Sequence, residues 1–496
     1  MQARYAAAIQ RRRQMEGKTK SVKKNMVMSA LLQLCSFLFP LLVFPYVSRV
    51  LLPEGLGKVS LALSVVNYFL MFAQLGIPTY GVVACARVRG DKRLLERTVQ
   101  ELLIINLVAC LAVYAAFAAA LVLVPEMREN LSLYLILSIS IILNALGVEW
   151  FYQAIEEYSY ITKRSVLLKL AALLLTFVLV KDRGDYLQYG FIAVFAQSAS
   201  GIVNFVNLRK HISLRKTDTY RFAKHLRSML TFMLITISVS IYTNLDSVML
   251  GFIRGETEVG YYTVAVKIKL ALVALMIAIN SVLLPRVSYC CDNNMMSHVK
   301  PILRKTTRLM LCISMPLSAF FMIYAGETIE ILAGSVYKQA VPAMIIIMPS
   351  LVIISVSSLY GQEVLVPMGG QRIVALGALA GGTVDFILNL VLIRYFGAAG
   401  AAFSTLTAEL VVAVIIFRAV DRELLKSCFS KLGAGRIAAG TLAASAVSSV
   451  LGHYLCSSWI TLFAGLPVFG AIYLVLAMRG ETAEAIIRIR KRIKKI

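Results

Sequence analysis

Long apolar runs, each about as long as a membrane-crossing helix, follow one another along most of the chain and are separated by short polar segments. About twenty helical residues cross the hydrocarbon core of a bilayer, and the runs lack the strict alternation of a barrel strand. We therefore predict an all-α polytopic membrane protein with about 14 transmembrane helices. The predicted spans are residues 26–48, 59–83, 99–123, 131–151, 165–180, 186–207, 229–250, 261–284, 309–325, 341–362, 373–393, 398–417, 437–453 and 457–478.

Composition and charge support this class and limit the partners. Hydrophobic residues make up 59% of the chain, which is more than a soluble domain normally carries. The formal net charge of +25 would suggest nucleic acid as the partner of a soluble protein. Here the basic residues stand between the apolar runs, where anionic lipid headgroups are available to them. We expect membrane lipids as partners, and no nucleic acid.

The distribution of Lys and Arg predicts how the spans are oriented. Of the 51 basic residues, 41 fall in alternate segments that we assign to the cytoplasm, eight fall in the opposite loops and two lie inside a span. Because cytoplasmic loops carry the excess of Lys and Arg, we predict an inner-membrane protein with both termini in the cytoplasm. The cytoplasmic segments are residues 1–25, 84–98, 152–169, 208–228, 285–308, 363–372, 418–436 and 479–496.

No feature of the sequence indicates an enzyme. The loops are short and leave no room for a catalytic domain. No nucleophile, metal or nucleotide motif stands out, and the eight cysteines and four histidines show no spacing typical of metal ligands. We predict a carrier with no catalytic residues, no metal site and no cofactor.

The two halves of the chain resemble each other weakly. The stretch "SRVLLPEGLGKVSLALS" from Ser48 is echoed by "SVMLGFIRGETEVGYYTVAVK" from Ser247, each with a helix end, an acidic glycine-containing turn and a second helix. Parallel repeats are typical of transporters with a substrate site between the halves, although small residues also serve helix packing alone. The predicted parts are a basic segment 1–25, an N-terminal bundle 26–207, a cytoplasmic linker 208–228, a C-terminal bundle 229–417, spans 13 and 14 at 437–478, and a basic amphipathic helix 481–496.

The last of these parts has its own pattern and its own alternative. Its isoleucines favour a helix that lies on the inner leaflet, and the alternative is a solvated basic tail. One helical stripe holds Ile486, Ile489, Ile493 and Ile496.

Three cations stand where lipid is expected. Lys267 and Lys269 lie inside the eighth span, and Arg49 follows the first. A charge near mid-bilayer costs about 2.5–3.5 kcal/mol on insertion scales, so it normally faces a cavity or a partner. Because the two lysines are two residues apart, they lie on different helix faces, and we expect Lys267 to point into a cavity. The alternative is that these side chains extend to the outer phosphates.

Acidic residues lie in the same half of the chain. Asp246 stands toward the outer end of span 7, Asp385 and Glu409 lie deep in spans 11 and 12, and Asn389 is one helical turn from Asp385. Acids at this depth indicate a cation or proton site, or internal pairing with the lysines. The sequence leaves both possibilities open.

A basic cavity is what an anion needs in order to cross hydrocarbon. Moving an unpaired ion into a medium of low dielectric costs tens of kcal/mol in the Born limit. A pyrophosphate headgroup therefore needs several cations to replace its water, and Arg can bind it through two hydrogen bonds. On this hypothesis Arg49, Lys267 and Lys269 line a pyrophosphate site.

Seven stretches carry a family resemblance: "FPYVSRVLLPEGLGKVSLALSVVNYF", "QLGIPTYG", "GVEWFYQAIEEYSYIT", "IYTNLDSVMLG", "EVGYYTVAVKIK", "LLPRVS" and "FILNLVLIRYFGAAGAAFST". In them the chain resembles the O-antigen and capsule repeat-unit flippases of the multidrug/oligosaccharidyl-lipid/polysaccharide exporter superfamily, which also contains the lipid II flippases. The resemblance implies two six-helix bundles in a V around a central cavity, two further C-terminal helices and alternating access. It implies undecaprenyl-pyrophosphate-linked oligosaccharide as the cargo, and polysaccharide polymerase machinery as a candidate partner.

The resemblance also implies site residues. Some lipid II flippases have a sodium site between spans 7, 11 and 12, and by position this implies a site for Na⁺ or H⁺ here. The order of acid and amide in span 11 is reversed in this chain. The implied residues are Asp246, Asp385, Asn389 and Thr405. Trp150 and Tyr152 of "EWFYQ" would stack on sugar rings or belong to an aromatic belt at the membrane interface.

Two other functions stay open at this point. A cation-coupled multidrug exporter of the same superfamily would need an acidic, aromatic cavity, and the three cations argue against one. A lipid scaffold or assembly partner without transport would leave the charges inside the spans unexplained.

Overall fold

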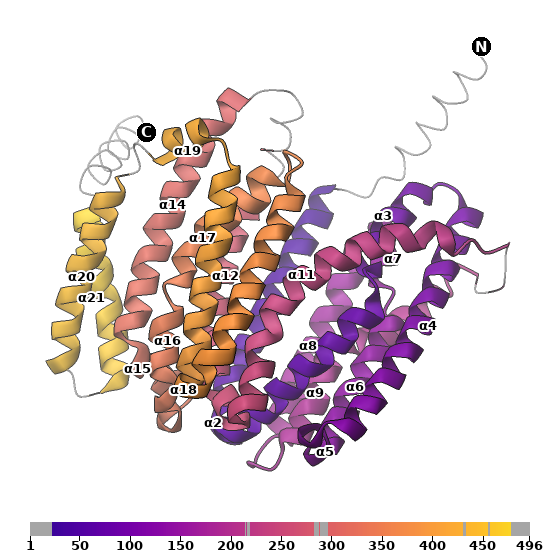
Figure 1. Ribbon diagram of the computed structural model, residues 1–496, viewed down its shortest axis with the longest axis horizontal. Coiled ribbons are helices and arrows are strands. Elements are labelled where there is room, and N and C mark those ends of the chain that lie inside the picture. Colours follow the sequence, from indigo (N-terminus) through magenta and orange to yellow (C-terminus); the bar gives the residue numbers. More distant parts are fainter. Residues whose placement is uncertain are drawn as a thin grey trace, which may run out of the picture. The chain divides into compact units, whose positions relative to one another are not determined.

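The computed structural model describes residues 22–213, 215, 219–281, 287, 296–429, 433–454 and 457–477, and every regular element in this part of the chain is helical. Figure 1 shows these helices, coloured along the chain. The predicted C-terminal helix 481–496 and residues 1–21 of the basic N-terminal segment lie outside the described residues.

The chain divides into two compact units. Unit 1 comprises Met1–Val43, Val66–Lys181 and Leu187–Thr236, and unit 2 comprises Phe44–Val65, Asp182–Tyr186 and Ile237–Ile496. Three helices contribute residues to both units: α2 (Val22–Gln74), α11 (Ala223–Arg254) and, by its first residue alone, α9 (Tyr186–Ser198). The arrangement of two bundles in a V around a central cavity stays a prediction.

Unit 1 also contains α3 (Ile77–Val88), α4 (Lys92–Leu123), α5 (Pro125–Glu129), α6 (Leu131–Ala145), α7 (Glu149–Ala154), α8 (Tyr158–Leu179), most of α9 (Tyr186–Ser198) and α10 (Ser200–Leu208). Residues of the predicted linker 208–228 are held against α4. The side-chain amide of Gln100 donates to the carbonyl oxygen of Ser213 (2.7 Å), and His225 Nε2 lies 2.7 Å from Glu101 Oε2. Backbone polar groups after α10 are thus satisfied by side chains of α4.

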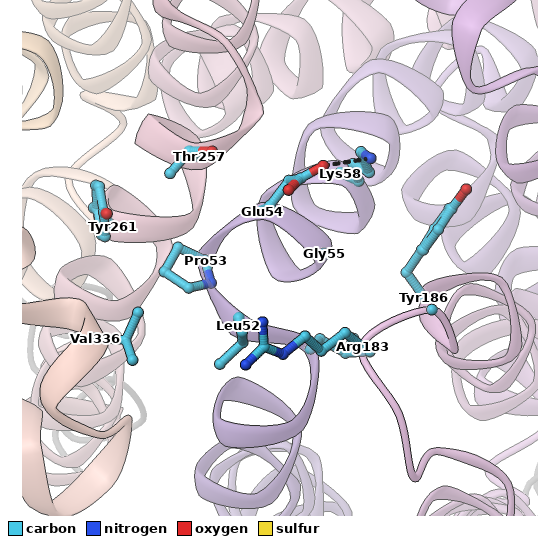
Figure 2. A pocket seen from close by; sticks show the side chains of 12 residues that line it. Leu52, Pro53, Glu54, Gly55, Lys58, Arg183, Tyr186, Thr257, Tyr261 and Val336 are labelled. Atoms are coloured by element: carbon cyan, nitrogen blue, oxygen red, sulfur yellow. Dashed lines mark hydrogen bonds and ion pairs between the residues drawn. The ribbon is translucent and has the colours of Figure 1, made fainter.

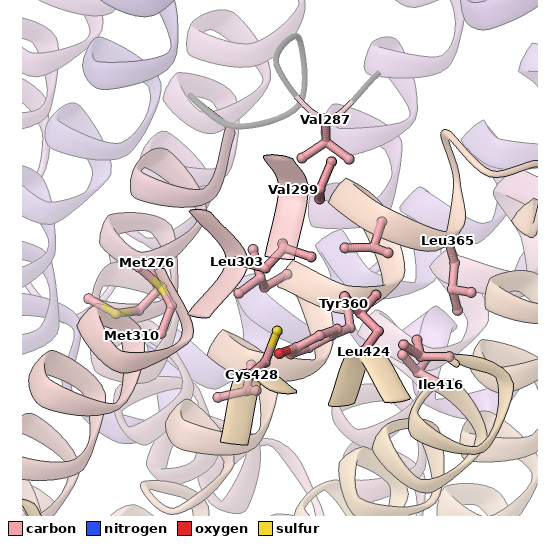
Figure 3. Close-up of a cluster of buried hydrophobic side chains, with 14 of the residues drawn as sticks. Met276, Val287, Val299, Leu303, Met310, Tyr360, Leu365, Ile416, Leu424 and Cys428 are labelled. Atoms are coloured by element: carbon pink, nitrogen blue, oxygen red, sulfur yellow. The ribbon is translucent and has the colours of Figure 1, made fainter. Parts of the chain in front are cut away.

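Unit 2 contains α12 (Glu256–Ser281), α14 (Met296–Ile323), α15 (Ala325–Leu332), η1 (Ser335–Ala340), α16 (Val341–Ile347), α17 (Ser350–Tyr360), η2 (Gly361–Leu365), α18 (Gln371–Ala419), α19 (Arg422–Phe429), α20 (Ala434–Tyr454) and α21 (Ser458–Ala477). Figure 3 shows one of its apolar cores, in which Met276, Leu303, Tyr360 and Ile416 meet from four helices. The Tyr360 hydroxyl lies 2.9 Å from Thr307 Oγ1, so its polar atom has a partner inside this core. The helices α20 and α21 pack on each other and against α14 and α15.

Nine helices of the described residues are long and apolar enough to cross a membrane, or ten if the bent pair Ser335–Ile347 and Ser350–Leu365 is one span. Two of the nine, Val27–Val88 and Gln371–Ala419, each cover two predicted spans. The reason is that α2 is broken at Leu52 (φ 58°, ψ 178°) and α18 at Gly397 (φ 53°, ψ −129°). The helices α8 and α11 occupy the fifth and seventh predicted spans but are not among the nine. The polytopic all-helical class is confirmed, and the number 14 stays a prediction.

The boundary between the two units differs from the boundary between the two predicted bundles. A close backbone contact between α2 and α12 in unit 2 explains part of this difference. A Cβ on Gly57 would lie 1.8 Å from the carbonyl oxygen of Glu256, and one on Gly260 would lie 2.0 Å from that of Pro53. The turn after the α2 break therefore packs directly on the first turns of α12. Residues 44–65 and 182–186 belong to unit 2 rather than to the N-terminal bundle, and 229–236 belong to unit 1.

We predict that Gly57→Ala destabilises the protein, because its methyl group would overlap the Glu256 carbonyl and force the two backbones apart. Overpacking of this kind costs about 1–3 kcal/mol. Thermal unfolding in detergent should show a lower midpoint for this variant. The matched control is Gly326→Ala in α15, where an added Cβ meets no atom within 4 Å. Equal midpoints for the two variants would contradict the prediction.

Candidate functional site

A buried carboxylate, Asp246 on α11, is the centre of a polar cluster inside unit 2. It is 5% exposed and accepts hydrogen bonds from Asn389 Nδ2 (2.7 Å), Thr405 Oγ1 (2.8 Å) and the Tyr262 hydroxyl. Asn389 and Thr405 come from the two parts of α18, and Tyr262 comes from α12. Three donors on one carboxylate offset much of the cost of removing its charge from water.

A second buried carboxylate adjoins the first. Asp385 is fully buried one turn before Asn389, whose amide also donates to Asp385 Oδ2 (3.3 Å). One amide thus bridges two acids. Two oxygens at this point, Asp385 Oδ1 and Asn389 Oδ1, are buried and have no hydrogen-bond partner among the described residues. Unpartnered buried oxygens mark a place where a cation or a proton would be favourable.

The charges of a lysine and a third acid belong to the same cluster. Lys269 lies two helical turns after Tyr262 on α12, and Glu409 lies one turn after Thr405 on α18. Both are buried, at 7% and 8% exposure. Lys269 lies within electrostatic range of Glu409, Asp246 and Asp385. The cluster therefore contains three acids and one lysine, and a cation site and internal pairing both stay open.

The donor set of this cluster fits a hard cation. Its unpartnered lone pairs are on carboxylate and amide oxygens, which are the ligands that such ions take. Within the described residues, no group of three or more His, Cys, Asp and Glu side chains is arranged to hold a metal ion. The oxygens that could hold Na⁺ are those of Asp246, Asp385, Asn389 and Thr405, which the structure brings together although the order in span 11 is reversed.

The start of the second part of α18 is fixed from α12. Glu258 Oε2 accepts a hydrogen bond from the backbone N–H of Ala398 (2.8 Å), directly after the break at Gly397. A carboxylate on the first N–H groups of a helix is favourable both as a cap and toward the helix dipole. This contact ties α12 to the start of the segment that carries Thr405 and Glu409.

Lys267 is separated from this cluster. Its side chain is exposed on the face of α12 that also exposes Leu270, and it has no hydrogen-bond or ion-pair partner in the part of the chain that the structure describes. Lys269 points the other way and is buried. The sequence argument placed the two lysines on different faces, and that is where they lie.

Arg49 makes a contact that the sequence did not suggest. One of its guanidinium nitrogens donates to the carbonyl oxygen of Ile331 (2.5 Å), and Ser48 Oγ donates to that of Leu332 (3.3 Å). These carbonyls belong to the last turn of α15. Carbonyl groups in the last turn of a helix have no N–H partner within the helix, and they carry negative partial charge. Arg49 is thus a helix cap within unit 2. Its side chain remains exposed beyond this bond.

Trp150 and Tyr152 require a correction. The sequence allowed them to contact sugar rings, but they are 5% and 0% exposed and belong to the apolar core of unit 1. A Cβ on Gly81 would lie 2.7 Å from the indole of Trp150, and the Tyr152 hydroxyl donates to the carbonyl oxygen of Asn204 (2.8 Å). Both rings are buried against other side chains, so neither ring face is open to a ligand in this structure.

Sequence reasoning missed two residues of the polar cluster. Tyr262 bonds both Asp246 and Thr405, and Glu258 fixes the helix that carries Thr405. A signal for Tyr262 was available, because it stands seven residues before Lys269 and therefore on the same face of α12.

Comparison with known proteins agrees with this architecture. The family described as "Polysaccharide biosynthesis protein" matches residues 22–290, and the MatE family matches residues 232–392. A protein of Escherichia coli (strain K12) named as an O-antigen transporter is 26% identical over 413 residues, which cover 82% of this chain and 99% of that protein.

Two solved structures have a similar fold. The lipid II flippase MurJ in an inward closed conformation has a TM-score of 0.70 at 13% identity, and the match covers 91% of this chain and 97% of MurJ. A multidrug resistance MATE transporter in an inward-facing conformation has a TM-score of 0.57 at 15% identity, covering 81% and 98%. These proteins are named as transporters and flippases, which confirms the prediction that the chain is not an enzyme. Because the first family matches more than half of the chain, this protein belongs to the polysaccharide biosynthesis protein family.

Proposed function

We propose that the protein is a flippase that moves undecaprenyl-pyrophosphate-linked oligosaccharide repeat units of an O-antigen, capsule or exopolysaccharide from the inner to the outer leaflet by alternating access. The proposal is supported by the family and by the likeness to an O-antigen transporter over almost that protein's full length. It places the chain in the inner membrane with both termini in the cytoplasm, among membrane lipids and beside the polysaccharide polymerase machinery.

The observation that carries the proposal is the unpartnered Lys267. It lies eleven residues after the first residue of α12, Glu256. At 1.5 Å per residue this is about 16 Å along the helix axis, near the middle of a bilayer. A lysine stem does not reach a headgroup from that depth, and an ammonium in lipid costs about 2.5–3.5 kcal/mol even on insertion scales. An exposed cation at this position is best explained by an anionic cargo.

The energetics of transport favour the same direction. The cation replaces part of the water that a pyrophosphate loses inside the membrane, through a charge-assisted hydrogen bond. With the inside of the membrane negative, each negative charge that moves outward gains about 2.3 kcal/mol per 100 mV. Release on the outer side is therefore driven without a covalent step on the protein.

Coupling to an ion is part of the proposal. Na⁺ held by the oxygens of Asp246, Asp385, Asn389 and Thr405 would supply positive charge to a cluster whose acids outnumber its lysine. Asn389 orients both carboxylates, and Tyr262 and Thr405 hold Asp246 in place. H⁺ is the alternative coupling ion, because protonation of one acid neutralises the cluster in the same way.

A cation-coupled multidrug exporter is the second candidate, and the match to the MatE family over residues 232–392 favours it. Its cationic substrates would need accessible acids. The acids of the polar cluster are buried, with Asp385 at 0% and Asp246 at 5% exposure, whereas Lys267 is exposed. A scaffold without transport would leave Lys267 without a role.

We predict that the gene restores polysaccharide export to a strain that lacks its own flippase, and that Lys267→Ala lowers export about tenfold or more, the value of one charge-assisted hydrogen bond. Lys267→Arg should retain more export than Lys267→Gln, because it keeps the charge.

Surface polysaccharide is quantified by gel electrophoresis, with membrane levels of each variant checked. Drug resistance without export would overturn the proposal in favour of the exporter, and equal export from the Arg and Gln variants would show that charge at this position does not matter.

We also predict that Lys269→Met strengthens the stabilisation of the protein by Na⁺, because it removes the internal cation that faces the same acids. One charge pair at an effective dielectric of 20 and a separation of about 8 Å contributes about 2 kcal/mol, so the sodium concentration at half-effect should fall on the order of tenfold. Thermal unfolding is followed in detergent while NaCl replaces choline chloride.

The matched control for this experiment is Lys267→Met, which removes the same charge from the other face of α12 and should leave the sodium half-effect unchanged. Asp385→Asn should abolish the sodium effect. If wild-type protein is stabilised equally by both salts, sodium is not the coupling ion, and a shift of the unfolding midpoint with pH that Asp385→Asn removes would then indicate H⁺.

A further inference from the structure

A cavity of about 510 Å³ lies within unit 2, at the end of the helices that the Lys/Arg distribution places outside the cell. Figure 2 shows it between the α2 break and the loop before α9, with Tyr186 on one side and Thr257, Tyr261 and Val336 on the other. It lies apart from the buried acids and from Lys267, none of which lines it. A volume between 300 and 1,000 Å³ is typical of sites for small ligands.

The frame of this cavity is preformed. Leu52, which lines it, has φ 58°, a backbone conformation that costs free energy for a residue with a side chain and that is concentrated at functional sites. The turn that follows Leu52 is held to α12 by the direct backbone contact at Gly57. The loop before α9 lies against Gly55, where a Cβ would be 3.5 Å from the carbonyl oxygen of Arg183. Three chain segments therefore hold the walls in place.

The two cations of the cavity differ in how they are satisfied. Lys58 Nζ lies 2.8 Å from Glu54 Oε1 and 3.8 Å from Glu256 Oε2, and it is 5.3 Å from the ring centre of Tyr186. Arg183 has neither a hydrogen-bond nor an ion-pair partner among the residues that the structure describes, and Figure 2 shows its guanidinium extending across the cavity toward Leu52. Of these two cations, Arg183 is therefore the one whose donors are free to bind a ligand.

We propose that this cavity binds an acidic saccharide unit, whose carboxylate or phosphate group is held by Arg183 while the ring packs on Tyr186. The proposal deepens the flippase function and rests on it. A planar carboxylate matches the two parallel N–H groups of a guanidinium, and an aromatic face suits the apolar side of a sugar ring.

The charge balance of the cavity indicates weak, reversible binding. Glu54 and Glu256 share Lys58, so these two acids together with Lys58 and Arg183 have no net charge, and the anion is held by one directed contact rather than by a positive field. A site for cargo that has just crossed the membrane has to release it. Acidic glycans would therefore be retained briefly at the outer surface, and neutral ones would pass with little retention.

The test measures binding to the full-length protein in phosphatidylcholine nanodiscs by saturation-transfer NMR titration. The probes are a glucuronate-containing tetrasaccharide of hyaluronan, neutral chitotetraose and inorganic phosphate. Wild-type protein should bind the acidic tetrasaccharide about tenfold or more tightly than chitotetraose, and Arg183→Gln should weaken that binding to the level of the neutral sugar. Arg183→Lys should be intermediate, and Tyr186→Ala should weaken both sugars.

The matched control is Arg394→Gln, which removes an exposed cation three residues before the α18 break at Gly397, in the same unit but outside the cavity lining, and its binding should equal wild type. Because Arg183 is exposed and unpartnered, Arg183→Gln should keep the wild-type unfolding midpoint. Equal binding by wild type and Arg183→Gln, or equal losses in Arg183→Gln and Arg394→Gln, would overturn the proposal. So would Arg183-dependent binding of phosphate, or of phosphatidylglycerol nanodiscs, without binding of the acidic sugar.

Failure of this site and failure of the flippase proposal are distinguishable. Binding at Arg183 is measured without transport, and export is measured in cells with Lys267 variants. If export depends on Lys267 but wild-type protein shows no preference for the acidic sugar, the cavity assignment is wrong and the flippase stands. If the acidic sugar binds but no glycan is exported, the transport proposal fails.

Discussion

The cost of placing a charge in an apolar medium is the constraint on which this structure depends. Four charged groups inside the helical units differ in how their surroundings reduce this cost. Asp246 is surrounded by three donors, Lys269 faces acids, and Arg49 caps the carbonyl end of α15. Asp246 and Arg49 have hydrogen-bond partners within the protein, and Lys269 lies near three acids. Lys267 has no such neighbour among the described residues, and we infer an anionic cargo from that difference rather than from the number of basic residues.

Broken helices are the second device that shapes unit 2. The breaks at Leu52 and Gly397 interrupt α2 and α18 at a single residue, so that the helix continues on both sides without a long loop. The first break forms the wall of the outer cavity. The second allows the two parts of α18 to present Asn389 and Thr405 to the same carboxylate. In unit 2 the two breaks thus adjoin the outer cavity and the polar cluster.

Much of the fold was predictable because apolar length is a property of single segments. The helical class, the absence of enzymatic function and the acidic partners in spans 7, 11 and 12 all followed from the chain. The reversed order of Asp385 and Asn389 still leaves both side chains in the cluster, because residues four apart lie on one face of a helix in either order. The breaks at Leu52 and Gly397 fall between predicted spans, because a glycine-containing turn follows the first and Gly397 itself marks the second.

Other assignments could not have been made from sequence, because they depend on neighbours. An aromatic pair such as Trp150 and Tyr152 fits an interface and a core equally well, and only the packing against Gly81 and Asn204 decides. The partner of Arg49 is the end of a short helix more than 280 positions away, and no local sequence pattern predicts this contact. When a helix is apolar on nearly all sides, its sequence does not tell which face is enclosed.

The bond between Glu258 and the N–H of Ala398 has a consequence for genetics. A substitution at Glu258 removes no ligand and no cargo contact, yet it frees the segment that carries Thr405 and Glu409 to rotate. Inactivating mutations found at Glu258 in a random screen would have the same phenotype as mutations of the acid cluster, although Glu258 lies outside that cluster. Second-site revertants would then be expected near the helix start around Ala398, which makes suppressor genetics a way to map how α12 steers α18.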